Sequence, residues 1–337
     1  MKSVVFTQPG VVKVEERSKP TIGSGDVLVK VHACGICGTD VHILRGEHIV
    51  KFPVVPGHEF SGEITEVGSD VCRLQVGDRV TIDPNIVDGT CYFCRRGYPH
   101  LCENLTAIGV NYDGGFAEYC VVPASQAYRI PDSLSLDEAA LAEPLACCIH
   151  GADQANICSG YTVVILGAGS AGLLLTQLAR ISGAGRVIVS EPDEDRRRLA
   201  MQLGADTVLD PQTQDVTTEV LRITRVGADV VVESAGRPET SALAMRLARR
   251  GGTILQFGMV TPGKSIDISP YDVYYRELTI VGSFVNPFTH ARAIELLASK
   301  RIDVLPLITH KLPLTKAEEA LSTFGTKGSI KILLVSQ

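Results

Sequence analysis

Short apolar runs, broken by glycine and proline, fill the first part of the chain. Strands are expected where β-branched residues gather in these runs, at 27–31, 62–67, 78–82 and 117–122. Closely spaced short strands are typical of a β-rich domain whose connecting loops carry function. We therefore expect residues 1–148 to form a β-rich first domain.

The pattern changes near residue 150, where apolar strands begin to alternate with helical segments. Six strands are expected, at 163–166, 186–190, 207–209, 229–233, 253–257 and 278–281, with helices between them such as 239–249. This alternation predicts a parallel, doubly wound α/β sheet over residues 149–285. The tail, 286–337, is expected to return to the first domain with helices at 291–299 and 314–321 and a strand at 331–335.

The composition fits an enzyme with two globular domains. Of the 337 residues, 45% are hydrophobic, which gives two cores enough apolar surface to bury. The formal net charge is -6 and no dense run of Lys and Arg occurs, so neither nucleic acid nor an anionic membrane surface is an expected partner. The arginines at 196–198 and 249–250 are expected on the solvated faces of helices.

The expected location of the protein decides how its cysteines are interpreted. The first residues lack the apolar segment of a signal peptide, and no stretch reaches the roughly eighteen apolar residues of a membrane span, so the expected location is cytoplasmic. In that reducing compartment the 10 cysteines are poor candidates for disulfides. Those that cluster, at Cys34/Cys37 and at Cys91/Cys94/Cys102, are better interpreted as metal ligands.

Three glycines follow the first strand of the second domain. Gly167, Gly169 and Gly172 lie between this strand and an apolar helix, and Glu191 ends the next strand. A glycine-rich turn alone is a weak signal, but in this context it predicts dinucleotide binding. Gly167 would permit the tight turn, Gly169 the approach of the pyrophosphate, and Gly172 close packing of helix and strand.

The acidic residue after the second strand favours NAD over NADP. Glu191 would accept hydrogen bonds from the adenosine ribose and repel a 2′-phosphate. Arg196 complicates this interpretation. One role for an arginine here is to neutralise such a phosphate, and the other is to stack on the adenine or bond the ribose hydroxyl.

A thiolate, an imidazole and a carboxylate lie in glycine-rich turns of the first domain. Cys37, His58 and Glu59 would supply three zinc ligands and leave a fourth position for substrate, as in a catalytic zinc site. Each also has an ordinary interpretation, as a buried thiol, a turn histidine or a surface charge. All three together, beside a nucleotide domain, favour zinc. Asp40 is a candidate to orient the imidazole of His58. Glu143 either binds the zinc or its water, or is a helix-start acid before a proline.

These motifs resemble those of the zinc-dependent medium-chain dehydrogenases and reductases, nearest the sorbitol (polyol) and threonine dehydrogenase branch. The likeness covers nearly the whole chain and is most specific at 35–40, 57–62, 76–80 and 167–172. It implies a GroES-like catalytic domain plus a Rossmann domain that binds NAD. It also implies that zinc, held by the three ligands above, activates an alcohol, and that a hydride moves to the nicotinamide. By the same resemblance, Glu143 lies near the metal-bound water and substrate, and Thr39 and His42 relay the proton of the alcohol to solvent.

In this family a lobe binds a structural zinc through four cysteines spaced C-x2-C-x2-C-x7-C. The spacing is intact here but the first ligand is an aspartate, in the set Asp88, Cys91, Cys94 and Cys102. Because a carboxylate oxygen is an acceptable zinc donor, either these four residues hold a structural zinc, or packing holds the lobe and three thiols are free. The remaining cysteines are expected in the cores: Cys34, Cys72, Cys120, Cys147, Cys148 and Cys158.

The resemblance implies oxidation of a secondary alcohol of a polyol or sugar alcohol to a ketose or ketone. Val285 and Asn286 occupy the positions where sorbitol dehydrogenases place an Arg-Tyr pair, which argues against sorbitol itself. The alternatives are an L-threonine 3-dehydrogenase, a non-catalytic NAD-binding sensor and a zinc-free quinone reductase. The family also implies a homodimer or homotetramer, for which the strand at 278–281 offers an edge.

Overall fold

A seven-stranded sheet organises the first of two units in the computed structural model, which describes residues 1–48 and 50–336. This unit contains Met1–Ala146, Pro287–Lys300 and Leu307–Gln337. Its strands are β1 (Lys2–Gln8), β2 (Val11–Glu16), β3 (Asp26–Gly35), β4 (Glu59–Val67), β5 (Arg79–Ile82), β6 (Asn85–Ile86), β7 (Thr106–Ala107), β8 (Tyr119–Pro123), β9 (Ala127–Arg129), β16 (Ile308–Pro313) and β17 (Lys331–Val335). Its helices are α1 (Gly38–Leu44), α2 (Leu136–Ala139), α9 (His290–Ala298) and α10 (Ala317–Thr323), and α3 (Ala142–Ala155) leads into the second unit.

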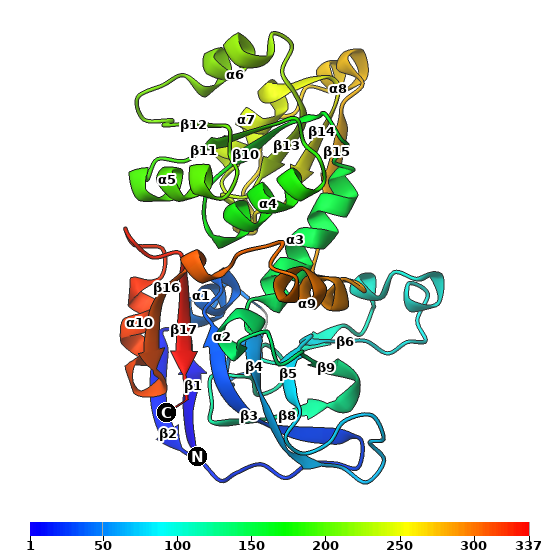
Figure 1. Cartoon of the computed structure of the whole chain (residues 1–337), viewed down its shortest axis with the longest axis vertical. Coiled ribbons are helices and arrows are strands. Elements are labelled where there is room, and N and C mark those ends of the chain that lie inside the picture. Colours follow the sequence, from blue (N-terminus) through cyan, green and yellow to red (C-terminus); the bar gives the residue numbers. More distant parts are fainter. Residues whose placement is uncertain (49, 337) are drawn as a thin grey trace. The chain divides into compact units, whose positions relative to one another are not determined.

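The main sheet of this unit is built around β3. The strand order is β16-β17-β3-β4-β5-β9, with β8 also paired to β3 (Figure 1). Because β3 lies inside the sheet, most of its side chains are buried. They join one apolar core that includes the fully buried Phe6, Phe60 and Phe116. The strands expected in this part of the sequence are present, as β3, β4, β5 and β8.

The second unit contains Cys147–Asn286 and Arg301–Pro306 and is built on a parallel sheet. Its strands are β10 (Thr162–Leu166), β11 (Arg186–Ser190), β12 (Thr207–Leu209), β13 (Ala228–Glu233), β14 (Ala248–Gln256) and β15 (Thr279–Gly282). Its helices are α4 (Ser170–Ile181), α5 (Glu194–Gln202), α6 (Val216–Thr224), α7 (Pro238–Leu247) and α8 (Pro270–Arg276).

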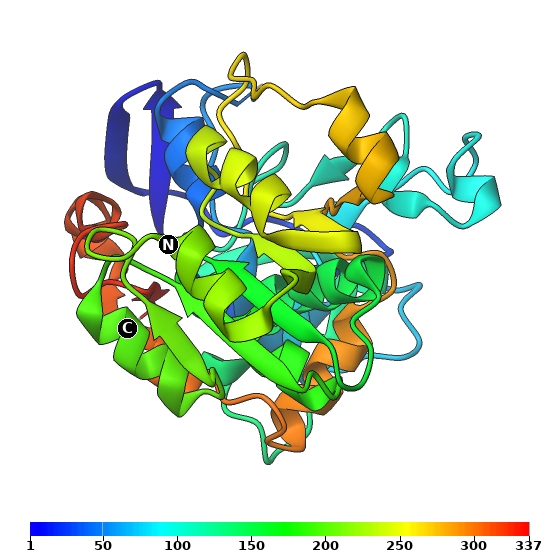
Figure 2. The ribbon, with the colours of Figure 1, turned by 90° about the horizontal axis from the view of Figure 1, so that it is seen from above.

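The six expected strands are confirmed in the order β12-β11-β10-β13-β14-β15, and every neighbouring pair is parallel. Helices cover both faces of the sheet (Figure 1), and Figure 2 shows its strands side by side. This order reverses direction between β10 and β13, as in a Rossmann fold. The predicted fold class, a β-rich domain plus a doubly wound sheet, is therefore confirmed.

Three local predictions were wrong. The helix expected at 239–249 ends at Leu247, and Arg249 lies in β14, where its Nε bonds Asp229 Oδ1 of the neighbouring strand at 2.6 Å. The tail helix expected at 314–321 is a 3-10 turn followed by α10, because Lys316 departs from helical geometry at the junction. Cys72 is exposed in the turn between β4 and β5, not in a core.

The other expected core cysteines are mostly enclosed. Cys34, Cys120 and Cys148 are buried, and Cys147 and Cys158 are half-buried. No helix among the described residues is long and apolar enough to cross a membrane.

A buried histidine in the first unit makes stability depend on pH. His290 begins α9 and is 1% exposed, and its ring lies 4.8 Å from that of Tyr128. Neither ring nitrogen has a hydrogen-bond partner among the described residues. Burial lowers the pKa of His290 from 6.5 to about 3. The folded state therefore keeps this ring neutral where the unfolded chain protonates it.

This histidine is expected to weaken the fold as the pH falls below 6.5. Between that pH and about 3, the unfolded state binds one more proton, so stability falls by about 1.4 kcal/mol per pH unit. His290→Leu removes this dependence. We expect the thermal midpoint of the variant to rise relative to that of the wild type when both are measured at pH 7, 6 and 5. Midpoints that fall in parallel would contradict the prediction.

Candidate active site and metal centres

Three potential metal ligands converge where α1 meets the start of β4. Cys37 is the N-cap of α1, while His58 and Glu59 enter β4. The ligand atoms of all three lie within 4.8 Å of one another. His58 and Glu59 are buried, and Cys37 is half-buried. One thiolate, one imidazole and one carboxylate form a donor set suited to zinc.

Two glycines make room for this cluster. A Cβ on Gly35 would lie 2.2 Å from Glu59 Oε2, so a side chain there would displace the carboxylate. Gly57 has a φ of +94°, and a Cβ there would lie 2.4 Å from the ring of Phe116 and 2.8 Å from Cys34 Sγ. The chain can therefore turn into His58 at this point only with glycine.

Asp40 joins the two loops that carry the cluster. It is fully buried, and its carboxylate accepts hydrogen bonds from the Cys37 N–H at 2.8 Å and the Gly57 N–H at 3.3 Å. Its Oδ1 also lies 3.5 Å from Nδ1 of His58. Burial alone lowers the pKa of His58, but the negative charges of Asp40 and Cys37 outweigh burial and raise this pKa well above 6.5. The site therefore favours a cation at the imidazole.

Two residues expected to move protons lie on α1 beside the cluster. Thr39 Oγ1 is 3.7 Å from Cys37 Sγ. His42 lies farther along the helix, and its Nδ1 is 2.5 Å from Oε2 of Glu47. Glu47 was not anticipated from the sequence.

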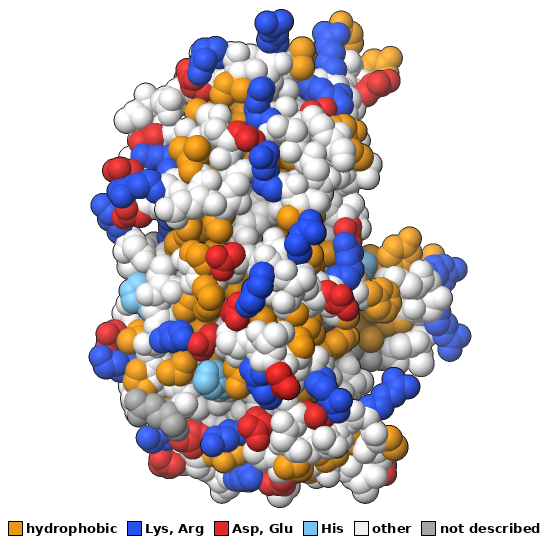
Figure 3. All heavy atoms as spheres, in the orientation of Figure 1, with side chains coloured by type: hydrophobic (Ala, Val, Ile, Leu, Met, Phe, Trp, Pro, Cys, Tyr) orange, Lys and Arg blue, Asp and Glu red, His pale blue; other side chains and the backbone are white. Residues whose placement is uncertain are grey.

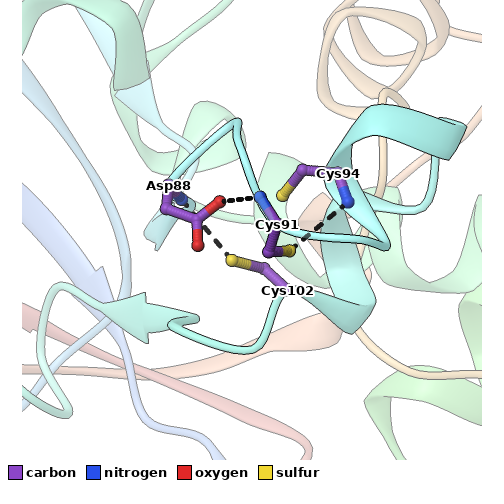
Figure 4. A group of neighbouring side chains, drawn as sticks. All are labelled: Asp88, Cys91, Cys94 and Cys102. Atoms are coloured by element: carbon purple, nitrogen blue, oxygen red, sulfur yellow. Dashed lines mark hydrogen bonds between the residues drawn. The ribbon is translucent and has the colours of Figure 1, made fainter.

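A second cluster lies in the lobe formed by residues 87–105, between β6 and β7. Apolar side chains gather on the outside of this lobe (Figure 3), and Tyr92, Tyr98 and Leu101 are among the exposed ones. Inside it, four side chains point toward one another (Figure 4), with ligand atoms within 4.8 Å: Asp88, Cys91, Cys94 and Cys102.

Hydrogen bonds hold this cluster in a form that suits a metal. Asp88 Oδ1 accepts from the N–H groups of Thr90 and Cys91 at 2.7 and 2.9 Å, and Oδ2 accepts from Asn104 Nδ2 at 2.7 Å. These donors, Cys91 first, lower the pKa of Asp88. The Sγ of Cys102 accepts hydrogen bonds from the N–H groups of Asp88 and Asn104, at 3.4 and 3.3 Å. A charged carboxylate among thiols is an acceptable zinc donor set.

The glycine turn of the second unit has the geometry expected for a nucleotide. Gly167 has a φ of +101°, and a Cβ on Gly172 would lie 2.0 Å from Gly167 O. Gly169 is the N-cap of α4 without a side-chain cap, and a Cβ on it would meet no atom within 4 Å. A side chain would therefore fill the open space in front of the N-terminal N–H groups of a twelve-residue helix.

Glu191 lies on the connection between β11 and α5, and Arg196 lies in α5 itself. Glu191 is buried, and its Oε2 accepts from the Ala168 N–H at 2.7 Å, while its Oε1 accepts from the Asp193 N–H at 3.0 Å. The carboxylate thus lies directly beside the glycine turn. Arg196 lies in the first turn of α5, which Asp193 caps.

Comparison with known proteins identifies the family. Residues 23–132 match the alcohol dehydrogenase GroES-like domain, and residues 171–299 match the zinc-binding dehydrogenase model. A D-arabinitol dehydrogenase of Uromyces fabae is 34% identical over 98% of this chain and 96% of its own length. An L-threonine 3-dehydrogenase of Pyrococcus horikoshii is 39% identical over 99% of both chains.

A solved structure from Sinorhizobium meliloti, described as a zinc-binding dehydrogenase bound to NADP, shares 44% identity and a TM-score of 0.96 over 99% of this chain and 98% of its own. The chain belongs to the zinc-dependent medium-chain dehydrogenases. Its relatives in this family include polyol and threonine dehydrogenases. The protein is an alcohol oxidoreductase that uses a pyridine nucleotide and zinc, as the sequence predicted. Membership of a zinc-binding enzyme family argues against the non-catalytic sensor and the zinc-free quinone reductase.

The structure of this dehydrogenase also reveals a residue that sequence reasoning missed. Lys331 begins β17 and is 2% exposed. Its Nζ lies 2.9 and 2.6 Å from the two carboxylate oxygens of Glu59 and donates to Ile36 O at 3.2 Å. A lysine at the head of an otherwise apolar strand was the only sequence signal. The candidate zinc ligand Glu59 is therefore one half of a buried ion pair.

The charge of this lysine is retained despite burial. Burial by itself lowers the pKa of Lys331, but the charges of Glu59, Cys37 and Glu143 outweigh it, and the pKa lies above its usual value. Glu143, in the first turn of α3, is 6% exposed. The charge of Glu143 helps to raise the pKa of Lys331, so this carboxylate acts electrostatically on the first cluster.

Replacing Lys331 is expected to lower the free energy of unfolding more in the metal-free protein than in the zinc-loaded protein. Lys331→Met leaves the Glu59 carboxylate buried without its cation, and breaking a buried pair costs about 3–5 kcal/mol. Zinc at Cys37 and His58 would restore a cation beside Glu59. Adding zinc to the metal-free protein should therefore raise the thermal midpoint of the variant more than that of the wild type.

The control is Lys316→Met, because the pair of Lys316 with Glu319 is exposed and contributes little. An equal loss of stability in the zinc-free and zinc-loaded forms of Lys331→Met would show that Lys331 does not act through Glu59.

Proposed function

We propose that this dehydrogenase oxidises a secondary alcohol of a polyol or sugar alcohol to a ketose or ketone, with NAD as hydride acceptor. The observation that carries the proposal is the set of Cys37, His58 and Glu59, two of them buried, with a threonine hydroxyl beside the thiol. Three protein ligands leave a position for a substrate oxygen. A D-arabinitol dehydrogenase among the relatives supports the substrate class.

Each residue near the cluster has a proposed role in this reaction. Cys37, His58 and Glu59 would hold zinc, which supplies Lewis-acid activation of the alcohol. Thr39 would accept the alcohol proton, and His42, paired with Glu47, would hold it at the end of the relay. Glu143 would lie near the substrate, as the family resemblance implies.

We propose that the first unit is the GroES-like catalytic domain and that the second is the NAD-binding domain. The glycine turn at Gly167, Gly169 and Gly172 would receive the pyrophosphate, and Glu191 would receive the adenosine ribose. This carboxylate, lying against the turn, favours NAD. Arg196 and the NADP bound to the Sinorhizobium meliloti protein make the nucleotide preference a quantity to measure.

Threonine dehydrogenation is the second candidate, because an L-threonine 3-dehydrogenase is 39% identical to this chain. The segment that would decide between the substrates includes Val285 and Asn286. Val285 has a φ of +48°, a left-handed conformation that is strained for a β-branched residue. Strain of this kind is typical of functional loops, which supports a role for this segment in substrate choice.

Activity measurements with a substrate panel test the function. Zinc-loaded protein is expected to form NADH from one series of polyols, with NAD preferred over NADP. Because Lewis-acid activation contributes several kcal/mol, Cys37→Ser should lower kcat/KM by about a hundredfold or more. Cys72→Ser, which alters an exposed thiol, should leave it unchanged. Turnover of L-threonine alone would assign the protein to the second candidate.

Metal analysis tests the second cluster. We propose that Asp88, Cys91, Cys94 and Cys102 hold a structural zinc, so that the wild type carries two zinc ions per chain. Asp88→Ala is expected to lose one zinc without losing the zinc that activates the alcohol, whereas Asp88→Cys should retain both. One zinc in the wild type, with three titratable thiols in the lobe, would contradict this assignment.

We also propose a homodimer or homotetramer. β15 is an edge of the parallel sheet, and Ile280 on it is 43% exposed. Nearby in sequence, Tyr271 and Tyr274 of α8 are 65% and 79% exposed. A mass of one chain in sedimentation equilibrium at micromolar concentration would exclude this proposal. The ten cysteines, all among the described residues, form no disulfide, which suits a reducing compartment, and we propose the cytoplasm as the location.

A further inference from the structure

A second buried glutamate of the NAD-binding unit has no role in the proposed reaction. Glu233 ends β13 and is fully buried. Its Oε1 accepts hydrogen bonds from the N–H groups of Ala235 and Gly236, both at 2.9 Å, and from Thr240 Oγ1 at 2.7 Å. Its Oε2 accepts from Gln256 Nε2 at 2.8 Å. Four neutral donors therefore converge on one carboxylate, near the N-terminal end of the ten-residue helix α7.

This residue also fixes the loop that follows β14. The backbone oxygen of Glu233 accepts from the N–H groups of Phe257 and Gly258 at 3.0 and 2.8 Å. The contact between the two loops is tight. A Cβ on Gly258 would lie 2.6 Å from Glu233 Oε2, and one on Gly236 would lie 2.6 Å from Met259 O. The loops after β13 and β14 thus form one packed assembly around the carboxylate.

The loop after β13 lies directly against the glycine turn. Ser234 Oγ donates to Leu166 O at 2.9 Å and to Gly167 O at 3.1 Å. A Cβ on Gly172 would lie 3.0 Å from Ser234 Oγ, and one on Gly167 would lie 3.2 Å from Ala235 Cβ. β10 and β13 are the neighbours between which the strand order reverses. Doubly wound sheets bind ligands outside the carboxyl ends of the strands at such a point.

We propose that Glu233 is a positioning residue for the nucleotide site. Its carboxylate fixes Ala235 and Gly236, and this loop in turn fixes the position of the glycine turn. This inference rests on the proposed binding of NAD by the second unit. It predicts that weakening the hydrogen bonds of Glu233 weakens nucleotide binding and leaves the zinc cluster of the first unit unaffected.

Two neighbouring residues of α7 provide a matched test. The hydroxyls of Thr240 and Ser241 lie 2.9 and 3.0 Å from Arg237 O. Only Thr240 also lies within reach of Glu233, and it shares its one hydroxyl hydrogen between the two acceptors. In the zinc-loaded full chain, Thr240→Val is expected to raise the Kd for NADH, measured by its fluorescence, about tenfold, as the loss of one hydrogen bond to a carboxylate implies. Glu233→Gln, which sets an amide donor against Gln256 Nε2, should raise it at least about tenfold. Ser241→Ala should change it less than about twofold, because it leaves every bond of Glu233 intact.

Kinetics separate positioning from a general loss of folding. The KM for NAD should rise with the Kd in Thr240→Val, while kcat at saturating NAD, the KM for the alcohol and the zinc content stay at wild-type values. A merely structural role would lower the active fraction and leave the Kd of the remaining protein unchanged. Equal Kd values for Thr240→Val and Ser241→Ala would overturn the positioning role of Glu233 but would leave the nucleotide-binding assignment standing. A wild type that binds neither NADH nor NADPH would overturn the nucleotide-binding assignment as well.

Discussion

The first unit depends on how it balances buried negative charge. Asp40, Glu59 and the thiol of Cys37 lie in or beside one small cluster, and ions in a protein interior are costly unless they are paired. Lys331 supplies one positive charge, through both oxygens of Glu59. The negative charge that remains acts on His58, whose pKa lies well above its usual value although burial lowers it. An environment that holds a proton on an imidazole this strongly also favours a divalent cation in place of that proton.

The second unit uses buried carboxylates in a different way. Glu191 follows β11 and Glu233 ends β13, the two strands that flank β10. Both accept hydrogen bonds from backbone N–H groups of the loops that follow the strands. Here neutral hydrogen-bond donors surround each carboxyl group, and among the described residues no cation does so. Such an arrangement fixes the conformation of loops that have little apolar surface of their own. The glycine turn between them has almost no side chains, so its shape depends on these neighbours.

The sequence predicted the larger features well, because they depend on local patterns. Apolar runs at short intervals identified the six parallel strands. Ligand types in glycine-rich turns, together with the resemblance to the family, identified both clusters that the fold brings together. Lys331 was missed because its partner Glu59 lies 272 positions away, and only the pairing of β17 with β3 and of β3 with β4 brings them together. Arg249 was assigned to a helix because its pairing with Asp229 across two strands leaves no periodic signal. Long-range charge pairing was therefore the information that local patterns lacked.

The same distinction explains why similarity to relatives fixes the reaction more firmly than the substrate. An arabinitol dehydrogenase and a threonine dehydrogenase, which act on different substrates, resemble this chain at 34% and 39% identity. Substrate choice depends on a few side chains whose contacts differ by a few kcal/mol. A left-handed conformation costs a residue such as Val285 about 1–2 kcal/mol, and it persists only where the surrounding structure requires it. The segment around Val285 therefore combines a departure from the sorbitol dehydrogenase pattern with a constrained backbone.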